Sequence, residues 1–177
     1  MSQLKVNSIV PAGGLLSGAS GGIIQIVQVV KTDTFSESLN QGVISSDTGL
    51  NVTITPSSNS NKILIIASVS MSCSNDNRNC ILLYKGGSVL SNAIGDADGS
   101  RTRVSCASFN SATSFMSNLN INFLDAPSTT SATTYGIRLK HGRNNNATVF
   151  LNRASDQGSG SDRDVAASFI TAMEVSG

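Results

Sequence analysis

The stretch Ile63-Leu64-Ile65-Ile66-Ala67-Ser68-Val69-Ser70-Met71-Ser72 decides the fold class. Apolar residues occupy every second position from Ile63 to Met71, and the positions between them become polar after Ile66. Side chains of a β-strand point alternately to opposite faces of a sheet, so this period of two predicts a strand with one buried face.

The same alternation recurs along most of the chain, and no segment shows the 3.6-residue period of an amphipathic helix. Strands are predicted over residues 23–30, 50–55, 63–72, 80–84, 89–90, 115–124, 135–140, 149–151 and 165–175. Two glycines, Gly86 and Gly87, separate two apolar runs and predict a hairpin. Such strands, separated by loops rich in Ser, Asn and Gly, predict an all-β fold, an antiparallel β-sandwich of jelly-roll type.

Length and composition exclude several classes of protein. A chain of 177 residues suits one domain, and 39% hydrophobic residues suffice for a core, which argues against disorder. The net charge of +1 and the low share of charged residues, 13%, argue against electrostatic capture of nucleic acid. The longest apolar run, residues 23–30, is too short to span a membrane, and no secretory signal is visible. We therefore expect no nucleic-acid partner and no membrane insertion.

Two predicted strands carry large apolar side chains on both faces: Ile63-Leu64-Ile65-Ile66 and Ile81-Leu82-Leu83. A two-layer sandwich leaves one face of each sheet outside, so the N-terminal arm, a loop or a neighbouring subunit must cover the second face. We expect a neighbour, with strand faces arranged around the axis of a homotrimer. A loop of the same chain is the alternative.

An N-terminal arm, residues 1–22, is predicted to precede the sandwich domain, residues 23–177. The apolar peptide that begins at Leu4 and ends at Pro11 is followed by a run that holds five of the chain's 16 glycines. Gly-rich backbone is costly to order, so this run is expected to serve as a tether. The apolar peptide is expected to dock on another protein through Leu4, Val6, Ile9 and Val10.

The nucleophile motifs in the chain lack the context that catalysis needs. Ser20 matches the pattern G-x-S-x-G but lies in the tether, not between a strand and a helix. His141 is the only histidine, is expected in a loop, and has no serine or cysteine at the spacing of a recognised nucleophile. We therefore expect no enzymatic activity.

Metal and cofactor signatures are weak as well. Asp96-Ala97-Asp98-Gly99 begins like a calcium loop, but Ala107 stands where an EF-hand needs glutamate. Cys73, Cys80 and Cys106 lack zinc spacing and are expected to be buried, reduced thiols. No metal and no cofactor is expected.

Two asparagine-rich loops are candidates for contact with a receptor, such as a glycan on a host surface. Their side chains offer amide donors and acceptors to sugar hydroxyls. Ordinary polar loops are the alternative. The basic residues Arg138, Lys140 and Arg143 are interpreted as a solvated strand face and loop, with a phosphate site as the alternative. The candidate receptor-facing residues are Asn75, Asn77, Arg78, Asn144, Asn145 and Asn146.

The opening of the chain, Leu4-Lys5-Val6-Asn7-Ser8-Ile9, resembles the N-termini of tail-fibre-like virion proteins of bacteriophages, especially those of marine and cyanobacterial phages. Residues 21–35 and 49–64, and the later Leu83-Tyr84-Lys85-Gly86-Gly87, are similar to the C-terminal β-domains of that family. The resemblance covers the first half of the chain, and its motifs are structural. It implies a trimeric β-sandwich attached to a virion by its N-terminal segment. This chain has no fibre shaft, so a short knob or a surface decoration is expected.

The leading hypothesis is a phage virion structural protein made in the host cytoplasm: a short trimeric tail fibre or knob. Its partners would be further copies of itself, a tail, baseplate or capsid protein bound through the arm, and a host surface glycan. One alternative is a capsid decoration or head-fibre protein that stabilises the shell. Another is a soluble carbohydrate-binding module.

Overall fold

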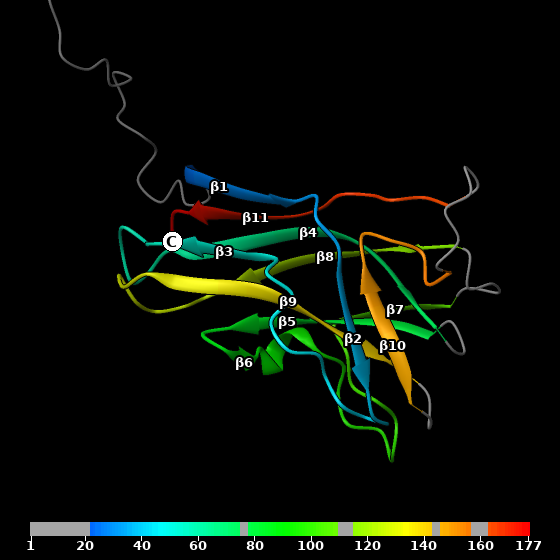
Figure 1. The fold of residues 1–177 in the computed structure, drawn as a ribbon. Coiled ribbons are helices and arrows are strands. Elements are labelled where there is room, and N and C mark those ends of the chain that lie inside the picture. The colour runs from blue at the N-terminus through cyan, green and yellow to red at the C-terminus, as the bar shows by residue number, and fades with distance from the viewer. Residues whose placement is uncertain (1–21, 75–77, 110–114, 143–145, 157–162) are drawn as a thin grey trace, which may run out of the picture.

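The computed structural model describes residues 22–74, 78–109, 115–142, 146–156 and 163–177. Within these ranges the strands form two antiparallel sheets and there is no α-helix, so the all-β prediction is confirmed (Figure 1). One 3-10 helix, η1 (Ser91–Ala93), is also present. The strands are β1 (Ile23–Lys31), β2 (Phe35–Leu39), β3 (Asn51–Ile54), β4 (Lys62–Cys73), β5 (Arg78–Lys85), β6 (Ser88–Val89), β7 (Cys106–Phe109), β8 (Ser117–Asp125), β9 (Thr133–His141), β10 (Ala147–Leu151) and β11 (Ser168–Val175).

The first sheet is built around the long central strand β4. Along one edge of β4 runs β8, which pairs from Ile63 to Met71. Along the other edge β11 pairs with the first half of β4 and β10 with its last three residues. Outside these, β1 pairs with β11 and β2 pairs with β10. The sheet therefore reads β1-β11-β4-β8 at one end and β2-β10-β4 at the other.

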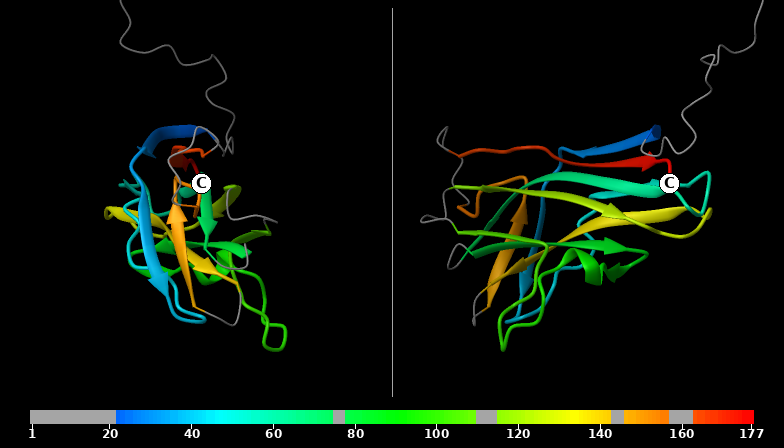
Figure 2. Two further views of the ribbon diagram at one scale, coloured as in Figure 1. Left: turned by 45° about the vertical axis from the view of Figure 1, so that its right-hand side comes forward. Right: turned by 180° about the vertical axis from the view of Figure 1, so that it is seen from behind.

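The second sheet is built around β5. On one edge β5 pairs with β9, which in turn pairs with β3. On the other edge the first half of β5 pairs with β7 and its last two residues pair with β6. Figure 2 shows the two sheets from two further sides.

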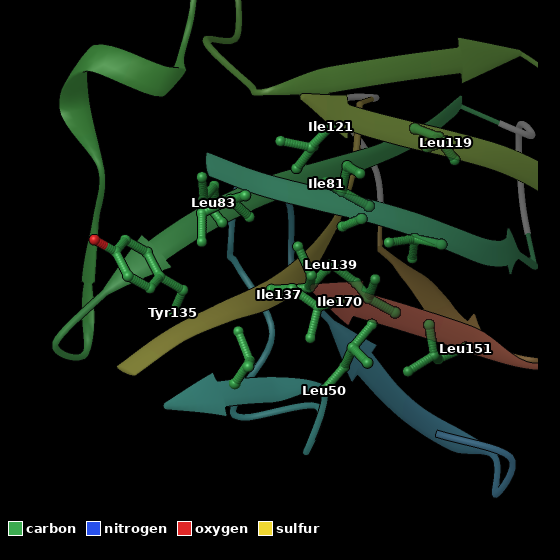
Figure 3. Packing of buried hydrophobic residues seen from close by; sticks show 14 of the residues in the cluster. Leu50, Ile81, Leu83, Leu119, Ile121, Tyr135, Ile137, Leu139, Leu151 and Ile170 are labelled. Atoms are coloured by element: carbon green, nitrogen blue, oxygen red, sulfur yellow. The ribbon is translucent and has the colours of Figure 1, made fainter. Parts of the chain in front are cut away.

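One hydrophobic core lies between the sheets. The alternating set from Ile63 to Met71 is fully buried there, as the opening stretch predicts. The core-facing residues of β9 are also those that the sequence alternation marks, Tyr135, Ile137 and Leu139. Figure 3 shows these side chains meeting others that come from both sheets. Labelled core residues are Leu50, Ile81, Leu83, Leu119, Ile121, Tyr135, Ile137, Leu139, Leu151 and Ile170.

The predicted hairpin is present between β5 and β6. Tyr84 pairs with Val89 and Lys85 with Ser88, which leaves only Gly86 and Gly87 in the turn. Both glycines have positive φ, 56° and 83°. Residues with side chains rarely adopt this backbone conformation. A two-residue hairpin turn requires it, because only such a turn matches the right-handed twist of the two strands.

A buried asparagine connects the two halves of the first sheet. Asn152, with φ 62°, follows β10 at the point where β11 replaces it beside β4. Its backbone N–H donates to Ser70 O (2.8 Å), and its Nδ2 donates to Lys31 O (2.8 Å) and Asp33 O (3.0 Å). Ser168 Oγ donates to Asn152 Oδ1 (2.6 Å). These bonds satisfy backbone groups between β1 and β2, where the strand ladder is interrupted.

Two features differ from the sequence prediction. The short strands β2 and β7 were not predicted; serines dilute their apolar pattern, and pairing with neighbouring strands sets their conformation. The last strand begins at Ser168, and exposed Val165 precedes it. In this strand the larger side chains, such as Met173, lie on the outer face, whereas Ile170 and Ala172 face the core.

Candidate functional site

The predicted docking residues Leu4, Val6, Ile9 and Val10 lie outside the described residues. The described chain begins at Gly22, whose N–H donates to Ser176 Oγ (3.2 Å) and whose carbonyl accepts from Ser176 N (2.9 Å). Residue 22 is therefore held beside the end of β11, close to the C-terminus (Figure 1). We call this place the arm attachment point.

A buried carboxylate stabilises the attachment point. Glu174 Oε1 accepts hydrogen bonds from Ser57 N (2.6 Å), Ser57 Oγ (2.7 Å) and Asn61 Nδ2 (2.6 Å), and Oε2 accepts from Gln25 Nε2. Burial alone would raise the pKa of Glu174, but the hydrogen bonds from Gln25, Asn61 and Ser57 outweigh it and lower this pKa to about 2. The ionised side chain therefore ties β11 to β1 and to the loop between β3 and β4.

A row of apolar side chains crosses the outer face of the first sheet. Ile26 of β1 pairs with Met173 of β11, Met173 pairs with Leu64 of β4, and Leu64 pairs with Leu124 of β8. Because these residues alternate with core residues, all four side chains point away from the core. Ile26 is 57% exposed and Leu124 is 48% exposed, while Leu64 and Met173 are partly exposed. We call these four residues the apolar row.

Away from the attachment point the outer face of this sheet mixes polar and apolar side chains. Met173 of the apolar row lies three residues before Ser176 in the chain. Further along the same face, Ser68 and Asn118 exchange hydrogen bonds. Gln28 Nε2 donates to Thr171 Oγ1 (2.9 Å) between these two regions. Exposed apolar side chains also lie beyond this region, where Val30 (54% exposed) pairs with Phe169 (37% exposed), but the row beside residue 22 crosses all four strands of this end of the sheet.

The second strand that was expected to need a neighbour, Ile81-Leu82-Leu83, does not need one. Leu82 points away from the core but is only 2% exposed, so its side chain is covered within the chain. The segment before β7 runs beside β5 here, where Ser105 N donates to Ile81 O (3.0 Å). For this strand the expectation of a neighbouring subunit is wrong and the alternative, cover by the same chain, holds.

Of the candidate receptor-facing residues, the structure describes Arg78 and Asn146. Asn75, Asn77, Asn144 and Asn145 lie outside the described residues. The ends of the two loops are adjacent, because Ser74 N donates to Thr148 O (2.9 Å) and Gly142 N donates to Arg78 O (3.1 Å). Ser74 and Asn146 line a small polar cavity of about 230 Å³ between the loop ends and β2. We call this region the loop end.

The candidate nucleophiles do not form a catalytic arrangement within the described residues. His141 is the last residue of β9 and is only 2% exposed, so the prediction of a loop histidine is wrong. Neither ring nitrogen has a hydrogen-bond partner among the residues that the structure describes. None of the three cysteines forms a disulfide, and Cys106 is partly exposed. Ser20 lies outside the described residues.

The described part of the chain holds no group of three His, Cys, Asp or Glu side chains that could bind a metal ion. It also contains no helix with the length and apolar character needed to cross a membrane. The sequence was compared with protein-family models and with curated proteins. No family model and no curated protein matches the chain.

Sequence reasoning found Leu64 but missed the other members of the apolar row. The signal for Ile26 was present, since residues 23–30 carry apolar side chains on both faces of the predicted strand. Met173 lies in the predicted strand 165–175, but its outward direction depends on register with β4. Leu124 stands at the end of a run whose other outward positions are asparagines.

Proposed function

We propose that this chain is a structural protein of a bacteriophage virion, a short trimeric tail fibre or knob anchored by its N-terminal arm. The observation that carries the proposal is the apolar row, an unpartnered aliphatic strip on a strand face directly beside the arm attachment point. A protein with this surface gains stability by assembling, and copies of the same chain present matching rows.

The strand order supports a jelly roll as the detailed fold. If β1 with β2 and β10 with β11 are each taken as one bent strand, both sheets have four strands in the orders β1/β2-β10/β11-β4-β8 and β3-β9-β5-β7. Each half of the chain then supplies alternate strands to the two sheets, as in paired Greek keys. Viral capsid domains and lectins use this architecture.

The position of the arm supports anchoring at one end and contact at the other. Val175, next to the attachment point, pairs with Lys62 at the start of β4, and Ser74 at the loop end directly follows β4. The twelve residues of β4 span roughly 35–40 Å at the usual rise per residue. A particle bound to the arm would therefore have the loop end directed away from it.

Quantitative mass spectrometry of purified phage particles tests this function. The expected result is a few dozen copies or fewer per particle, in a multiple of three. Hundreds of copies would favour the alternative of a capsid decoration or head-fibre protein. Absence of the chain from particles, with binding of glycans by the free protein, would refute the proposal and favour the soluble carbohydrate-binding module.

A further inference from the structure

A second cavity, of about 360 Å³, opens on the outer face of the second sheet, close to the loop end. Its size falls in the range of small-molecule sites, about 300–1,000 Å³. The strands contribute Arg78, Cys80 and Ala107, and Gly142 follows β9. The segment between η1 and β7 contributes Ser100, Arg101, Thr102 and Val104.

The floor of the cavity is a cross-strand row on the outer face. Cys80 pairs with Lys140 of β9 on one side and with Ala107 of β7 on the other. The Cys80 side chain is buried, and burial raises its pKa to about 11 even though Arg78 and Lys140 act to lower it. The Cys80 thiol is therefore neutral at physiological pH. It carries no negative charge that would offset the positive charges of Arg78 and Lys140.

Arg78 lines this cavity, and Lys140 lies on the neighbouring strand, paired with Cys80. Arg78 Nη1 donates to the carbonyl of Gly142 (3.0 Å), which fixes the guanidinium at the rim, and among the described residues its other N–H groups have no partner. Among the described residues, neither Arg78 nor Lys140 has a carboxylate within ion-pair distance. Arg101 differs, since it is paired with Asp98.

We propose that this cavity binds an anionic sugar, through a carboxylate or phosphate group held by Arg78, with Lys140 on the neighbouring strand adding positive charge beside it. A guanidinium presents paired N–H donors that match both oxyanions. Ser100 and Thr102 supply hydroxyls for the sugar's own hydroxyl groups, and Val104 with Ala107 supplies an apolar wall for its C–H face. The biological setting, an acidic polysaccharide on the host surface, rests on the proposed function, whereas the binding itself does not.

Titration calorimetry with the full chain tests the proposal, using glucuronic acid, glucose 6-phosphate and uncharged glucose as probes at low salt. At least one of the two anionic sugars should bind and glucose should bind much more weakly. Binding of glucuronic acid alone identifies a carboxylate ligand, and binding of glucose 6-phosphate alone identifies a phosphate ligand. Affinity should fall as salt is added, because the cations are near the surface.

Two variants assign the binding to this cavity. Arg78→Gln should weaken it by about ten- to a hundredfold, the usual effect of removing one charge-assisted hydrogen-bonding group. The matched control Arg153→Gln removes an arginine that stacks on Phe150 of the other sheet and should leave affinity unchanged. Equal thermal midpoints for the two variants establish that both are folded.

The proposal is overturned if neither anionic sugar binds, if glucose binds equally well, or if Arg78→Gln binds as tightly as the native chain. This outcome is separate from the proposed function. A chain found on particles without sugar binding contradicts only the cavity, and sugar binding by a chain absent from particles contradicts only the virion role.

Discussion

Replacing Ile26 and Leu124 together by serine should separate the proposed trimer into folded single chains. Both side chains belong to the apolar row and are about half exposed in one chain, at 57% and 48%. The half of each that is already buried contributes about 1 kcal/mol to the isolated fold, which should therefore stay folded without it, and the exposed halves are what a neighbouring copy would cover.

The size of the effect follows from that exposure. Burying a whole aliphatic side chain contributes about 1.5–3 kcal/mol, so covering half of each contributes about 1 kcal/mol, or about 2 kcal/mol per subunit. Repeated in three subunits this is about 6 kcal/mol per trimer. Since about 1.4 kcal/mol is tenfold in an equilibrium constant, and the midpoint concentration varies as the square root of this constant, the midpoint should rise about a hundredfold.

Sedimentation equilibrium over a dilution series measures this midpoint. The control is Asn120→Ser, which changes an outward polar residue of the same sheet and should leave the midpoint unchanged. If the double variant forms trimers with the native midpoint, the apolar row does not join the subunits and the reasoning is refuted. A drop in the thermal midpoint of the single chain by much more than about 10 °C would show instead that these residues act mainly within the fold.

Three further predictions concern single features of the chain. The pKa of Glu174 is about 2 in the folded chain and 4.5 as a free side chain, so its stabilisation is complete above about pH 4.5 and is lost as the pH falls toward 2. Urea unfolding should show that Glu174→Gln lowers stability by about 2 kcal/mol at pH 7, and by much less at pH 2.5; an equal loss at both pH values would contradict the ionised network. Asn152→Ala should cost about 2–4 kcal/mol in the same assay, because two partly buried backbone carbonyls and the buried Ser168 hydroxyl lose their partner, and a loss below 0.5 kcal/mol would contradict that role. Val6→Asp with Ile9→Asp should leave the thermal midpoint unchanged but prevent incorporation into particles; normal incorporation would contradict arm docking.

The period-two pattern predicts the long strands well, because one face of each must be apolar to form the core. This holds for β4, β8 and β9, whose alternating residues are buried in the order that the sequence marks. The hairpin at Gly86-Gly87 is equally local, since the turn itself requires glycine. Such features depend on neighbours in the sequence and can be read from it directly.

The other features depend on contacts between distant segments. Asn152 bonds to carbonyls more than 115 residues away, so its sequence neighbours give no sign of its role. The cavity beside Cys80 combines residues near positions 78, 100–107 and 142. Of these the sequence marked only Arg78 as a candidate, and it interpreted Lys140 as part of a solvated face. Strand order brings them together, and no local pattern encodes that order.

Cryo-electron microscopy of the intact particle tests the central claim most directly, because it shows both the place and the direction of the chain. The account predicts three copies around a threefold axis on the tail, with Gly22 next to the particle and the apolar rows facing the axis. The loop end, with Arg78 and Asn146, should point outward. Density for single copies, or for trimers with Arg78 against the particle and Gly22 outward, would contradict the account.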